Sequence, residues 1–317
     1  MTLAEHREMK NRRTANAIAI DEALLRQWPL PMPFSDDDKE GRGHILVVAG
    51  SREMPGAAVL AATAALRAGA GKLVIATDVG AAQSVALAIP ESRVIALRKT
   101  RKGGIAEDGV EELGDLCKSV DAVVLGPGMQ EETALCEFVV ALMSRVDHAK
   151  FLLDASAMDV MRAADAGAKP AHGSIERFAK PAILTPHAGE MAHLTGLTKQ
   201  TIDNDPRKAA TDAAGQWNAV IVLKGPCSYI APPDGRLWKH DGGNVGLATS
   251  GSGDTLAGII GGLLARGAAL EQAAAWGVAL HALAGEQLVE KFGPLGFLAR
   301  ELLPEIAPLL HSLRPRR

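Results

Sequence analysis

The sequence predicts a three-layer α/β/α fold in which a mainly parallel central sheet is covered by helices on both faces. From His44 onward, short apolar runs alternate with longer helix-like stretches, as in consecutive βαβ units. The apolar runs are continuous rather than alternating, which is typical of parallel strands buried on both faces. The chain has 317 residues, of which 47% are hydrophobic, so it can bury one large core.

The first βα unit is the clearest. A strand is expected at residues 45–48, followed by a helix at 55–68 that has proline in its first turn. Further strands are expected at residues 73–76, 122–125, 151–153, 182–184 and 219–223, with helices at 131–144 and 206–217. Since parallel α/β sheets bind ligands at the carboxyl ends of their strands, each turn after a strand is a candidate site.

The pattern changes near residue 228. Residues 228–231 and 236–239 flank Pro232-Pro233-Asp234-Gly235, which indicates a β-hairpin with Asp-Gly in its turn. After the hairpin the chain is nearly all helical, with helices expected at 253–265, 270–291 and 296–310. We see no internal repeats, so residues 41–317 are predicted to form one domain.

Residues 1–40 are predicted to be an N-terminal extension. A weakly amphipathic stretch at 15–28 precedes Pro29, Pro31 and Pro33, and the acidic run Asp36-Asp37-Asp38 follows. We interpret this segment as an arm that wraps the surface or contacts a partner, and not as a separate domain.

Composition excludes several classes of function. A net charge of −3 provides no general attraction to nucleic acid or anionic membranes, and 3% aromatic residues are too few for base-stacking platforms. The three cysteines match no metal or redox spacing, so we expect reduced thiols. No signal peptide is visible, and the apolar run at 255–265 is too short to span a bilayer. We therefore expect a soluble, cytoplasmic protein.

The strongest motif is Gly251-Ser252-Gly253-Asp254, which leads into an apolar helix containing Gly258, Gly261 and Gly262. Free backbone N–H groups at a glycine-rich helix start, with the positive end of the helix dipole, form an anion hole for phosphate. Asp254 lies at its edge and could accept a proton from an attacking hydroxyl. The alternative for Asp254 is a helix cap, and the coincidence of carboxylate and anion hole favours catalysis.

Other turns after predicted strands are weaker signals. The turn at 50–57 is not a Walker A motif because Ala57-Ala58 stand where Lys-Ser/Thr is required. Gly126-Pro127-Gly128 can end a strand or admit a ligand close to the backbone. Asp154 fits a functional carboxylate or a helix N-cap about equally well.

Two later turns carry charged groups. In Thr185-Pro186-His187-Ala188-Gly189-Glu190, the histidine is catalytic or structural with roughly even odds, and the glutamate suits a helix start. In Lys224-Gly225-Pro226-Cys227-Ser228, a lysine at the end of an apolar strand suits a nucleotide-lining loop, or is simply solvated.

Residues 248–254 together with Lys224-Gly225 resemble the signature of the ribokinase-like superfamily. Within it, the chain resembles the ADP/ATP-dependent NAD(P)H-hydrate dehydratases over roughly residues 40 to 310. The matching motifs occur in family order at residues 44–51, 55–58, 65–71, 126–128, 185–190, 223–225 and 251–254. The combination of motifs is specific, although no single motif is.

The resemblance implies a metabolite-repair lyase that dehydrates the S epimer of hydrated NADH or NADPH. ADP or ATP, with Mg²⁺ whose ligands are unknown, would phosphorylate the ring hydroxyl and yield AMP or ADP and phosphate. It also implies a homo-oligomer, a tetramer in relatives, working with a separate epimerase. The implied substrate-binding residues are Ala57, Gly128, His187 and Asp254, which is also the catalytic base. The implied nucleotide-binding residues are Lys224, Gly225, Pro226, Cys227, Ser228, Gly251, Ser252 and Gly253.

Two departures and two rival functions stand beside this interpretation. Ser250 replaces a usual glycine, and Ser156 replaces a usual acidic residue or glycine after Asp154. A small-molecule kinase of the same superfamily, such as a hydroxyethylthiazole, hydroxymethylpyrimidine or sugar kinase, would share the anion hole and Asp254. A non-catalytic nucleotide sensor is the rival from another class, and an intact Asp254 argues against it.

Overall fold

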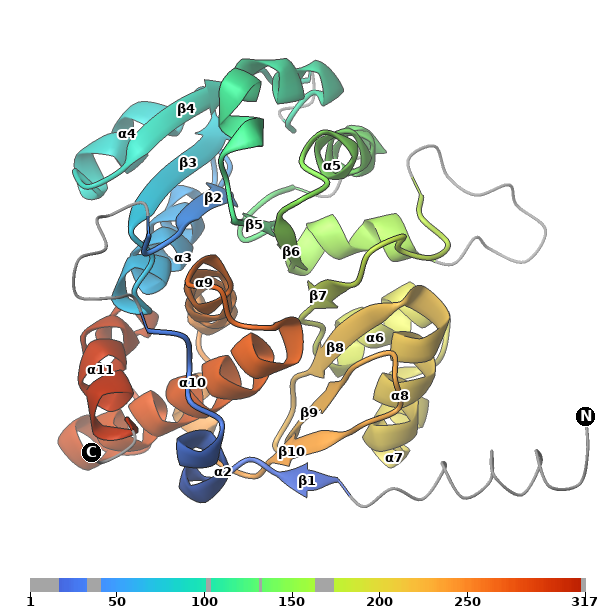
Figure 1. Cartoon of the computed structure of the whole chain (residues 1–317), viewed down its shortest axis with the longest axis vertical. Helices are drawn as coiled ribbons and strands as arrows, with labels where there is room; N and C mark the ends of the chain where they lie inside the picture. Colours follow the sequence, from blue (N-terminus) through green and yellow to red (C-terminus); the bar gives the residue numbers. More distant parts are fainter. Residues whose placement is uncertain (1–16, 33–40, 101–103, 131–132, 163–173, 315–317) are drawn as a thin grey trace, which may run out of the picture.

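The computed structural model describes residues 17–32, 41–100, 104–130, 133–162 and 174–314, and a ten-stranded sheet runs through their centre (Figure 1). The strand order is β1-β10-β9-β8-β7-β6-β5-β2-β3-β4. From β8 to β4 all neighbouring strands are parallel, whereas β9 is antiparallel to both β8 and β10. The predicted fold class, a mainly parallel sheet between helical layers, is confirmed.

The strands are short and mostly buried. Their bounds are β1 Ile18–Ala19, β2 His44–Val48, β3 Lys72–Asp78, β4 Arg93–Leu97, β5 Ala122–Leu125, β6 Lys150–Leu153, β7 Ala182–Leu184, β8 Ala219–Leu223, β9 Ser228–Ala231 and β10 Trp238–His240. The helices are α2 Glu22–Gln27, α3 Pro55–Arg67, α4 Ala82–Ala88, α5 Thr133–Arg145, α6 Ala188–Thr195, α7 Lys199–Asn204, α8 Pro206–Trp217, α9 Ser252–Ala265, α10 Leu270–Phe292 and α11 Ala299–Ser312. Three 3₁₀ segments are η1 Glu107–Lys118, η2 Ala155–Met161 and η3 Val245–Leu247.

Two hydrophobic layers sandwich the sheet, because side chains of a strand alternate between its faces. Ile45 and Val47 of β2 belong to the layer that contains α3, α9, α10 and α11. Leu46 and Val48 belong to the opposite layer, with η1, α5, α6 and α8. The continuous apolar run at residues 45–48 is thus explained by burial on both sides.

Helix α9 lies against α3 at very short range. A Cβ atom added to Gly258 would lie 2.1 Å from the carbonyl oxygen of Ala61, and one added to Gly262 would lie 2.4 Å from that of Ala65. Only glycine permits this backbone approach. The glycines of α9 thus allow it to pack tightly against α3.

Several element boundaries differ from the sequence-based predictions. Within the weakly amphipathic stretch at 15–28, the described residues form two elements: β1 pairs with β10, and α2 begins after Asp21, whose carboxylate accepts a hydrogen bond from the Leu24 N–H at 2.8 Å. Strand β4 was not anticipated, α9 begins at Ser252 rather than 253, and α11 begins at Ala299 rather than 296. Residues 131–132 of the helix predicted at 131–144 lie outside the described residues.

The described part of the N-terminal extension packs against the domain. The rings of Trp28 and Trp238 stack with centroids 5.7 Å apart, and Trp276 Nε1 donates a 2.8 Å hydrogen bond to the Trp28 carbonyl. Gln272 also donates to the carbonyl of Pro29 at 3.0 Å. Pro33 and the acidic run Asp36-Asp37-Asp38 lie outside the described residues, so the predicted boundary at residue 40 stays a prediction.

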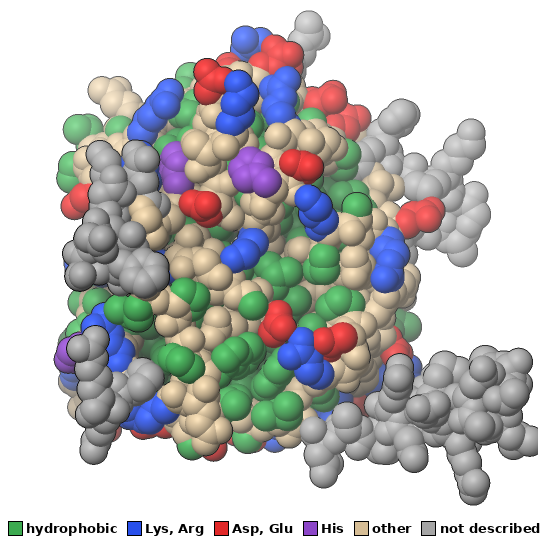
Figure 2. All heavy atoms as spheres, viewed as in Figure 1, with side chains coloured by type: hydrophobic (Ala, Val, Ile, Leu, Met, Phe, Trp, Pro, Cys, Tyr) green, Lys and Arg blue, Asp and Glu red, His purple; other side chains and the backbone are tan. Residues whose placement is uncertain are grey.

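The surface is consistent with the small net charge. On the face viewed in Figure 2, Lys and Arg side chains are interspersed with Asp and Glu. Within the described part of the chain, no helix combines the length and apolar character needed to cross a membrane.

Candidate active site

The turns after β2, β5 and β6 meet at the carboxyl ends of these strands. The Gly50 N–H donates a 2.7 Å hydrogen bond to the carbonyl of Pro127. A Cβ added to Gly126, whose φ is +117°, would lie 1.8 Å from the carbonyl oxygen of Asp154. These contacts bring three of the turns singled out in the sequence into one place.

Ala57 and Gly128 are direct neighbours at these strand ends. Ala57 lies in the first turn of α3 and is 8% exposed. Gly128 has a φ of +65°, and a Cβ there would lie only 2.4 Å from that of Ala57. The structure therefore brings together two of the four residues that the resemblance assigns to the substrate, with space for no larger side chains between them.

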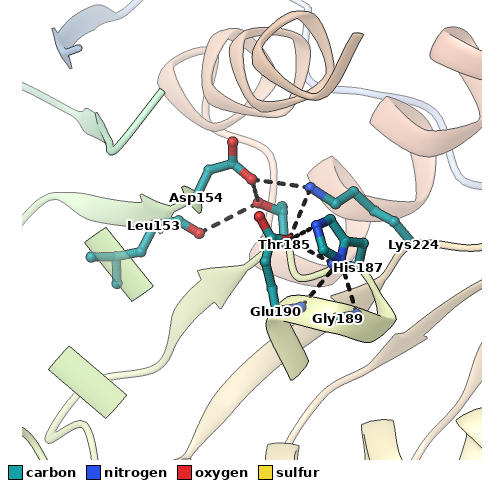
Figure 3. Close-up of polar contacts among 7 residues, drawn as sticks. All are labelled: Leu153, Asp154, Thr185, His187, Gly189, Glu190 and Lys224. Atoms are coloured by element: carbon teal, nitrogen blue, oxygen red, sulfur yellow. Dashed lines mark hydrogen bonds and ion pairs between the residues drawn. The ribbon is translucent and has the colours of Figure 1, made fainter. Parts of the chain in front are cut away.

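A cluster of charged side chains occupies the ends of β6, β7 and β8 (Figure 3). Lys224 Nζ lies 3.3 Å from Asp154 Oδ1 and 3.7 Å from Glu190 Oε2. The Thr185 hydroxyl donates a 2.5 Å hydrogen bond to the same Asp154 oxygen. We call Asp154, Thr185, Glu190 and Lys224 the paired cluster.

The paired cluster keeps Lys224 protonated. Burial by itself would lower the pKa of Lys224, but the carboxylates of Asp154 and Glu190, with the hydrogen bond to Asp154, outweigh it and raise the pKa overall. Asp154 is 3% exposed and makes no side-chain cap hydrogen bond to the η2 segment that follows it. Of the two interpretations of Asp154, the structure thus disfavours the helix N-cap.

His187 caps helix α6 while leaving one ring nitrogen accessible. Its Nδ1 accepts hydrogen bonds from the N–H groups of Gly189 and Glu190 at 3.0 and 3.1 Å. The Glu190 carboxylate in turn accepts from the His187 N–H at 2.7 Å, which completes a capping box. Because Nδ1 is an acceptor, the neutral ring carries its proton on Nε2. The side chain is 58% exposed, and its Nε2 lies 3.6 Å from Glu190 Oε2, so a ligand that takes this N–H competes with that carboxylate.

Helix α9 begins as the glycine-rich motif predicts. Gly251, with a φ of +86°, is the N-cap, and Asp254 lies in the first turn. The cap alternative for Asp254 is therefore wrong. N–H groups in the first turn of a helix have no intrahelical acceptor. Here the Ser252 N–H donates to the Thr249 carbonyl at 3.2 Å, which leaves the next two N–H groups of the turn for an incoming anion. We call this first turn, residues 251–254, the anion hole.

Asp254 is a stronger base than an ordinary aspartate. Burial raises its pKa, the neighbouring Asp154 carboxylate raises it further, and Lys224 partly opposes both, so that the pKa is about 6. A carboxylate with this pKa is mostly ionised at neutral pH yet accepts a proton more readily than an exposed one. Lys224 adjoins the anion hole as well, since a Cβ added to Gly253 would lie 3.6 Å from Nζ.

The remaining residues of the predicted nucleotide loop form the turn between β8 and β9. Of residues 224–228, Lys224 is the one whose side chain adjoins the anion hole, next to Gly253. The Cys227 thiol donates a 2.8 Å hydrogen bond to Asp241 Oδ1, and this bond, together with burial, raises the thiol pKa. Cys227 is thus protonated at neutral pH and is not a nucleophile. The roles of Gly225, Pro226, Cys227 and Ser228 stay predictions.

Sequence reasoning missed three contributors. Thr185 and Glu190 were noticed within a motif, but their contacts with Asp154 and Lys224 depend on strand order. His281 on α10 was not considered, although its Nε2 lies 2.9 Å from the Ser252 hydroxyl oxygen. The one available signal was a histidine inside an otherwise apolar helical run. Ser156, a departure from the family pattern, donates to the Met129 carbonyl at 3.2 Å.

A cavity of about 310 Å³ adjoins the site on the His187 side. It is lined in part by Ala155, Ser156, His187 and Glu190. Its place beside the exposed ring of His187 gives an organic ligand room next to the strand ends.

Comparison with known proteins places this geometry in context. Residues 45–308 match the model of a family described as NAD(P)H-hydrate dehydratase. The chain is 44% identical, over 93% of its length and 96% of the relative's, to the ADP-dependent (S)-NAD(P)H-hydrate dehydratase of Xanthomonas campestris. It is 36% identical, over 90% of its length, to the bifunctional NAD(P)H-hydrate repair enzyme of Moorella thermoacetica, of which it spans 52%.

Solved structures agree with the sequence comparisons. The ADP/ATP-dependent NAD(P)H-hydrate dehydratase from Bacillus subtilis, co-crystallised with ATP/Mg²⁺, matches with a TM-score of 0.78 and 30% identity, covering 95% of this chain and all of that one. A ribokinase-like superfamily protein from Enterococcus faecalis matches with a TM-score of 0.79 at 22% identity, covering 95% of this chain and 97% of its own, which shows the shared fold.

Proposed function

The chain belongs to the NAD(P)H-hydrate dehydratase family, and we propose that it repairs hydrated NADH and NADPH by dehydrating the S epimer with ADP or ATP as phosphoryl donor. The enzyme is a lyase that releases AMP or ADP together with phosphate. The observation that carries this proposal is the position of Asp254, a carboxylate with a raised pKa in the first turn of α9 beside the anion hole. A base and a phosphate site in contact are what phosphoryl transfer to a hydroxyl needs.

The reaction proceeds in two stages. Asp254 accepts the proton of the ring hydroxyl, and the oxygen attacks the terminal phosphorus of the nucleotide, which breaks the bond to AMP or ADP. The N–H groups of the anion hole stabilise the charge on the transferring phosphoryl group. Phosphate then leaves with the electrons of the carbon–oxygen bond, driven by the ring nitrogen lone pair. Loss of a proton from the adjacent carbon restores the double bond.

The other site residues hold the two substrates. Ala57 and Gly128 form a wall without long side chains for the hydrated nicotinamide, and the His187 Nε2–H donates to it. Lys224, protonated at working pH, binds nucleotide phosphates beside Gly253. The proposed nucleotide-binding set is Lys224, Gly225, Pro226, Cys227, Ser228, Gly251, Ser252 and Gly253.

A divalent cation fits the paired cluster. Among the described residues, no three His, Cys, Asp or Glu side chains form a metal-binding group. Mg²⁺, however, is commonly held by one or two carboxylates together with substrate phosphates. Asp154 and Glu190, both within 4 Å of Lys224 Nζ, are two such carboxylates beside the anion hole. When bound, Mg²⁺ would neutralise charge on the nucleotide phosphates.

The proposal extends to partners and location. Bifunctional relatives support a functional link with an epimerase activity that supplies the S epimer. None of the three cysteines, all within the described residues, forms a disulfide, which supports a reducing compartment such as the cytoplasm. A homo-tetramer stays a prediction, to be measured by light scattering.

Turnover of hydrated NADH tests the proposal. Purified protein is mixed with hydrated NADH, Mg²⁺ and either ADP or ATP, and recovery of the near-ultraviolet NADH absorbance is followed. We expect recovery with equimolar release of phosphate. A stable phosphorylated product without NADH would instead identify a small-molecule kinase, and nucleotide binding without any turnover would identify a sensor.

A further inference from the structure

His281 contacts the first residue of α9, at the start of the anion hole helix. It belongs to α10, the long helix that packs against α9. Its Nε2 is 2.9 Å from the Ser252 hydroxyl oxygen. Ser252 is 4% exposed and is the first residue of α9. This half-buried ring therefore holds the side chain of the first residue of α9.

The histidine is uncharged under working conditions. Burial and the charge of Lys224 lower its pKa and hydrogen bonding to Ser252 only partly opposes them, so that the pKa is about 4. A nitrogen of the neutral imidazole can donate to or accept from a hydroxyl, which suits the contact with Ser252. It also adds no second positive charge next to Lys224.

The composition of the anion hole explains why such an anchor is needed. Gly251 and Gly253 have no side chains by which the rest of the protein could fix them, and Gly251 has a φ of +86°. Asp254 must stay free to accept a proton. Ser252 is consequently the one side chain of residues 251–254 that can tie the loop to its surroundings, and His281 is the group it meets.

We propose that His281 is a positioning residue, which acts through Ser252 to align the N–H groups of the anion hole with the phosphoryl group in transfer. This inference rests on the proposed function for its chemistry. Alignment matters most when charge builds up on the transferring group, so the effect falls on kcat more than on nucleotide binding. AMP has no terminal phosphoryl group to transfer, so its affinity is not expected to depend on His281.

The first experiment compares His281→Leu with His281→Gln, whose amide can place a polar group near the position of Nε2. We expect His281→Leu to lower kcat by about 10- to 100-fold, less than the loss of a direct oxyanion donor. The dissociation constant for AMP should stay within about twofold, and His281→Gln should recover most of kcat because the contact with Ser252 is restored. A role in stability alone would give no such split between kcat and AMP binding.

Gln272→Leu is the matched control. Gln272 is another polar side chain on α10, 6% exposed, but it anchors Trp28 and Pro29 of the N-terminal extension. We expect this variant to lose stability and to keep the wild-type kcat. Equal loss of kcat in Gln272→Leu and His281→Leu would overturn the positioning role.

Ser252→Ala and the double variant with His281→Leu test the path of the effect, and Ser252→Ala serves alone where His281→Leu does not fold. If the two residues act as one unit, the double variant is no slower than the slower single variant. Losses of kcat that simply multiply would overturn the inference.

Binding separates this inference from the proposed function. The ratio of AMP to ADP dissociation constants reports the contacts of the second phosphate and needs no turnover. If wild-type protein fails to dehydrate hydrated NADH, the proposed function fails, while a decrease of that ratio in His281→Leu and its return in His281→Gln still support the inference. An unchanged ratio together with an unchanged kcat would overturn it.

Discussion

The paired cluster and the anion hole differ in whether their carboxylates are paired with a cation. In the paired cluster, Lys224 lies within 4 Å of Asp154 and Glu190, and Thr185 donates to Asp154 as well. In the anion hole, the charges of Asp154 and Lys224 affect the pKa of Asp254. Within the described residues, however, neither side chain makes a hydrogen bond or ion pair with Asp254. In the paired cluster every carboxylate has a cation within 4 Å, whereas in the anion hole the carboxylate of Asp254 has no cation in direct contact among the described residues.

This difference suits the paired cluster to binding and the carboxylate of Asp254 to proton transfer. Where a cation lies against the carboxylates, they stay ionised and hold Lys224, the proposed ligand of incoming phosphates. Where burial acts without a direct partner, the pKa of Asp254 rises to about 6, and the carboxylate becomes a useful base. Four substitutions test this comparison, in order of decreasing expected effect.

The largest effect is expected for Asp254→Asn. The amide cannot accept the hydroxyl proton, so we expect kcat to fall by about 10³-fold. ADP affinity should change little, because the N–H groups of the anion hole remain. Steady-state kinetics and ADP titration measure both. Asp212→Asn, at an exposed aspartate of α8, is the control and should keep full turnover.

The same variant should change stability in the opposite direction. Since the folded-state pKa of Asp254 is raised, ionising it costs stability as the pH rises from about 4 through about 6. Asparagine avoids that cost, so Asp254→Asn should be more stable than wild type at pH 8 by on the order of 2 kcal/mol and equal to it near pH 4. Urea unfolding at both pH values measures this. Near-normal turnover, or no gain in stability at pH 8, would contradict the assignment of Asp254 as a buried base.

A smaller effect is expected for Lys224→Met. Removing the cation leaves Asp154 buried without its partner, which should cost about 3 kcal/mol in the free energy of unfolding. Lys224 also opposes the rise in the Asp254 pKa, so the acid limb of the kcat/KM profile should move above pH 6. The profile is measured between pH 5 and about 9.

Asp154→Asn gives the matching opposite result. Because the Asp154 carboxylate raises the pKa of Asp254, its neutralisation should move the acid limb of the same profile below pH 6. If both substitutions moved the limb in one direction, the paired cluster and the anion hole would not be coupled through charge as proposed.

The smallest effect is expected for Thr185→Val. It removes the hydrogen bond to Asp154 Oδ1 but leaves the ion pair with Lys224 in place. We expect a loss of about 1 kcal/mol in the free energy of unfolding and a change of less than about threefold in kcat. Thermal unfolding and steady-state kinetics check both. A loss of turnover as large as that of Asp254→Asn would mean that Thr185 takes part in the chemistry.

Much of the fold and part of the site could be predicted from local sequence. Continuous apolar runs such as residues 45–48 predict buried parallel strands, because a strand covered by helices on both faces of the sheet needs apolar side chains at every position. Strand β4, Arg93–Leu97, escaped prediction because it lies at the edge of the sheet, where its burial pattern is mixed. Residues 15–28 were read as one amphipathic stretch because the pairing of β1 with β10 is not visible locally.

By itself, the sequence determined the anion hole and Asp254, since residues 251–254 are contiguous and a helix start needs no distant partner to expose its N–H groups. It also carried the resemblance to the dehydratase family, which the comparisons confirm. Only the tertiary structure decided how these groups are charged. Asp154 and Lys224, 70 residues apart, meet because β6, β7 and β8 are neighbours, and His281 reaches Ser252 because α10 packs on α9. A pKa depends on burial and on charges within a few ångströms, and those distances are set by packing rather than by spacing along the chain.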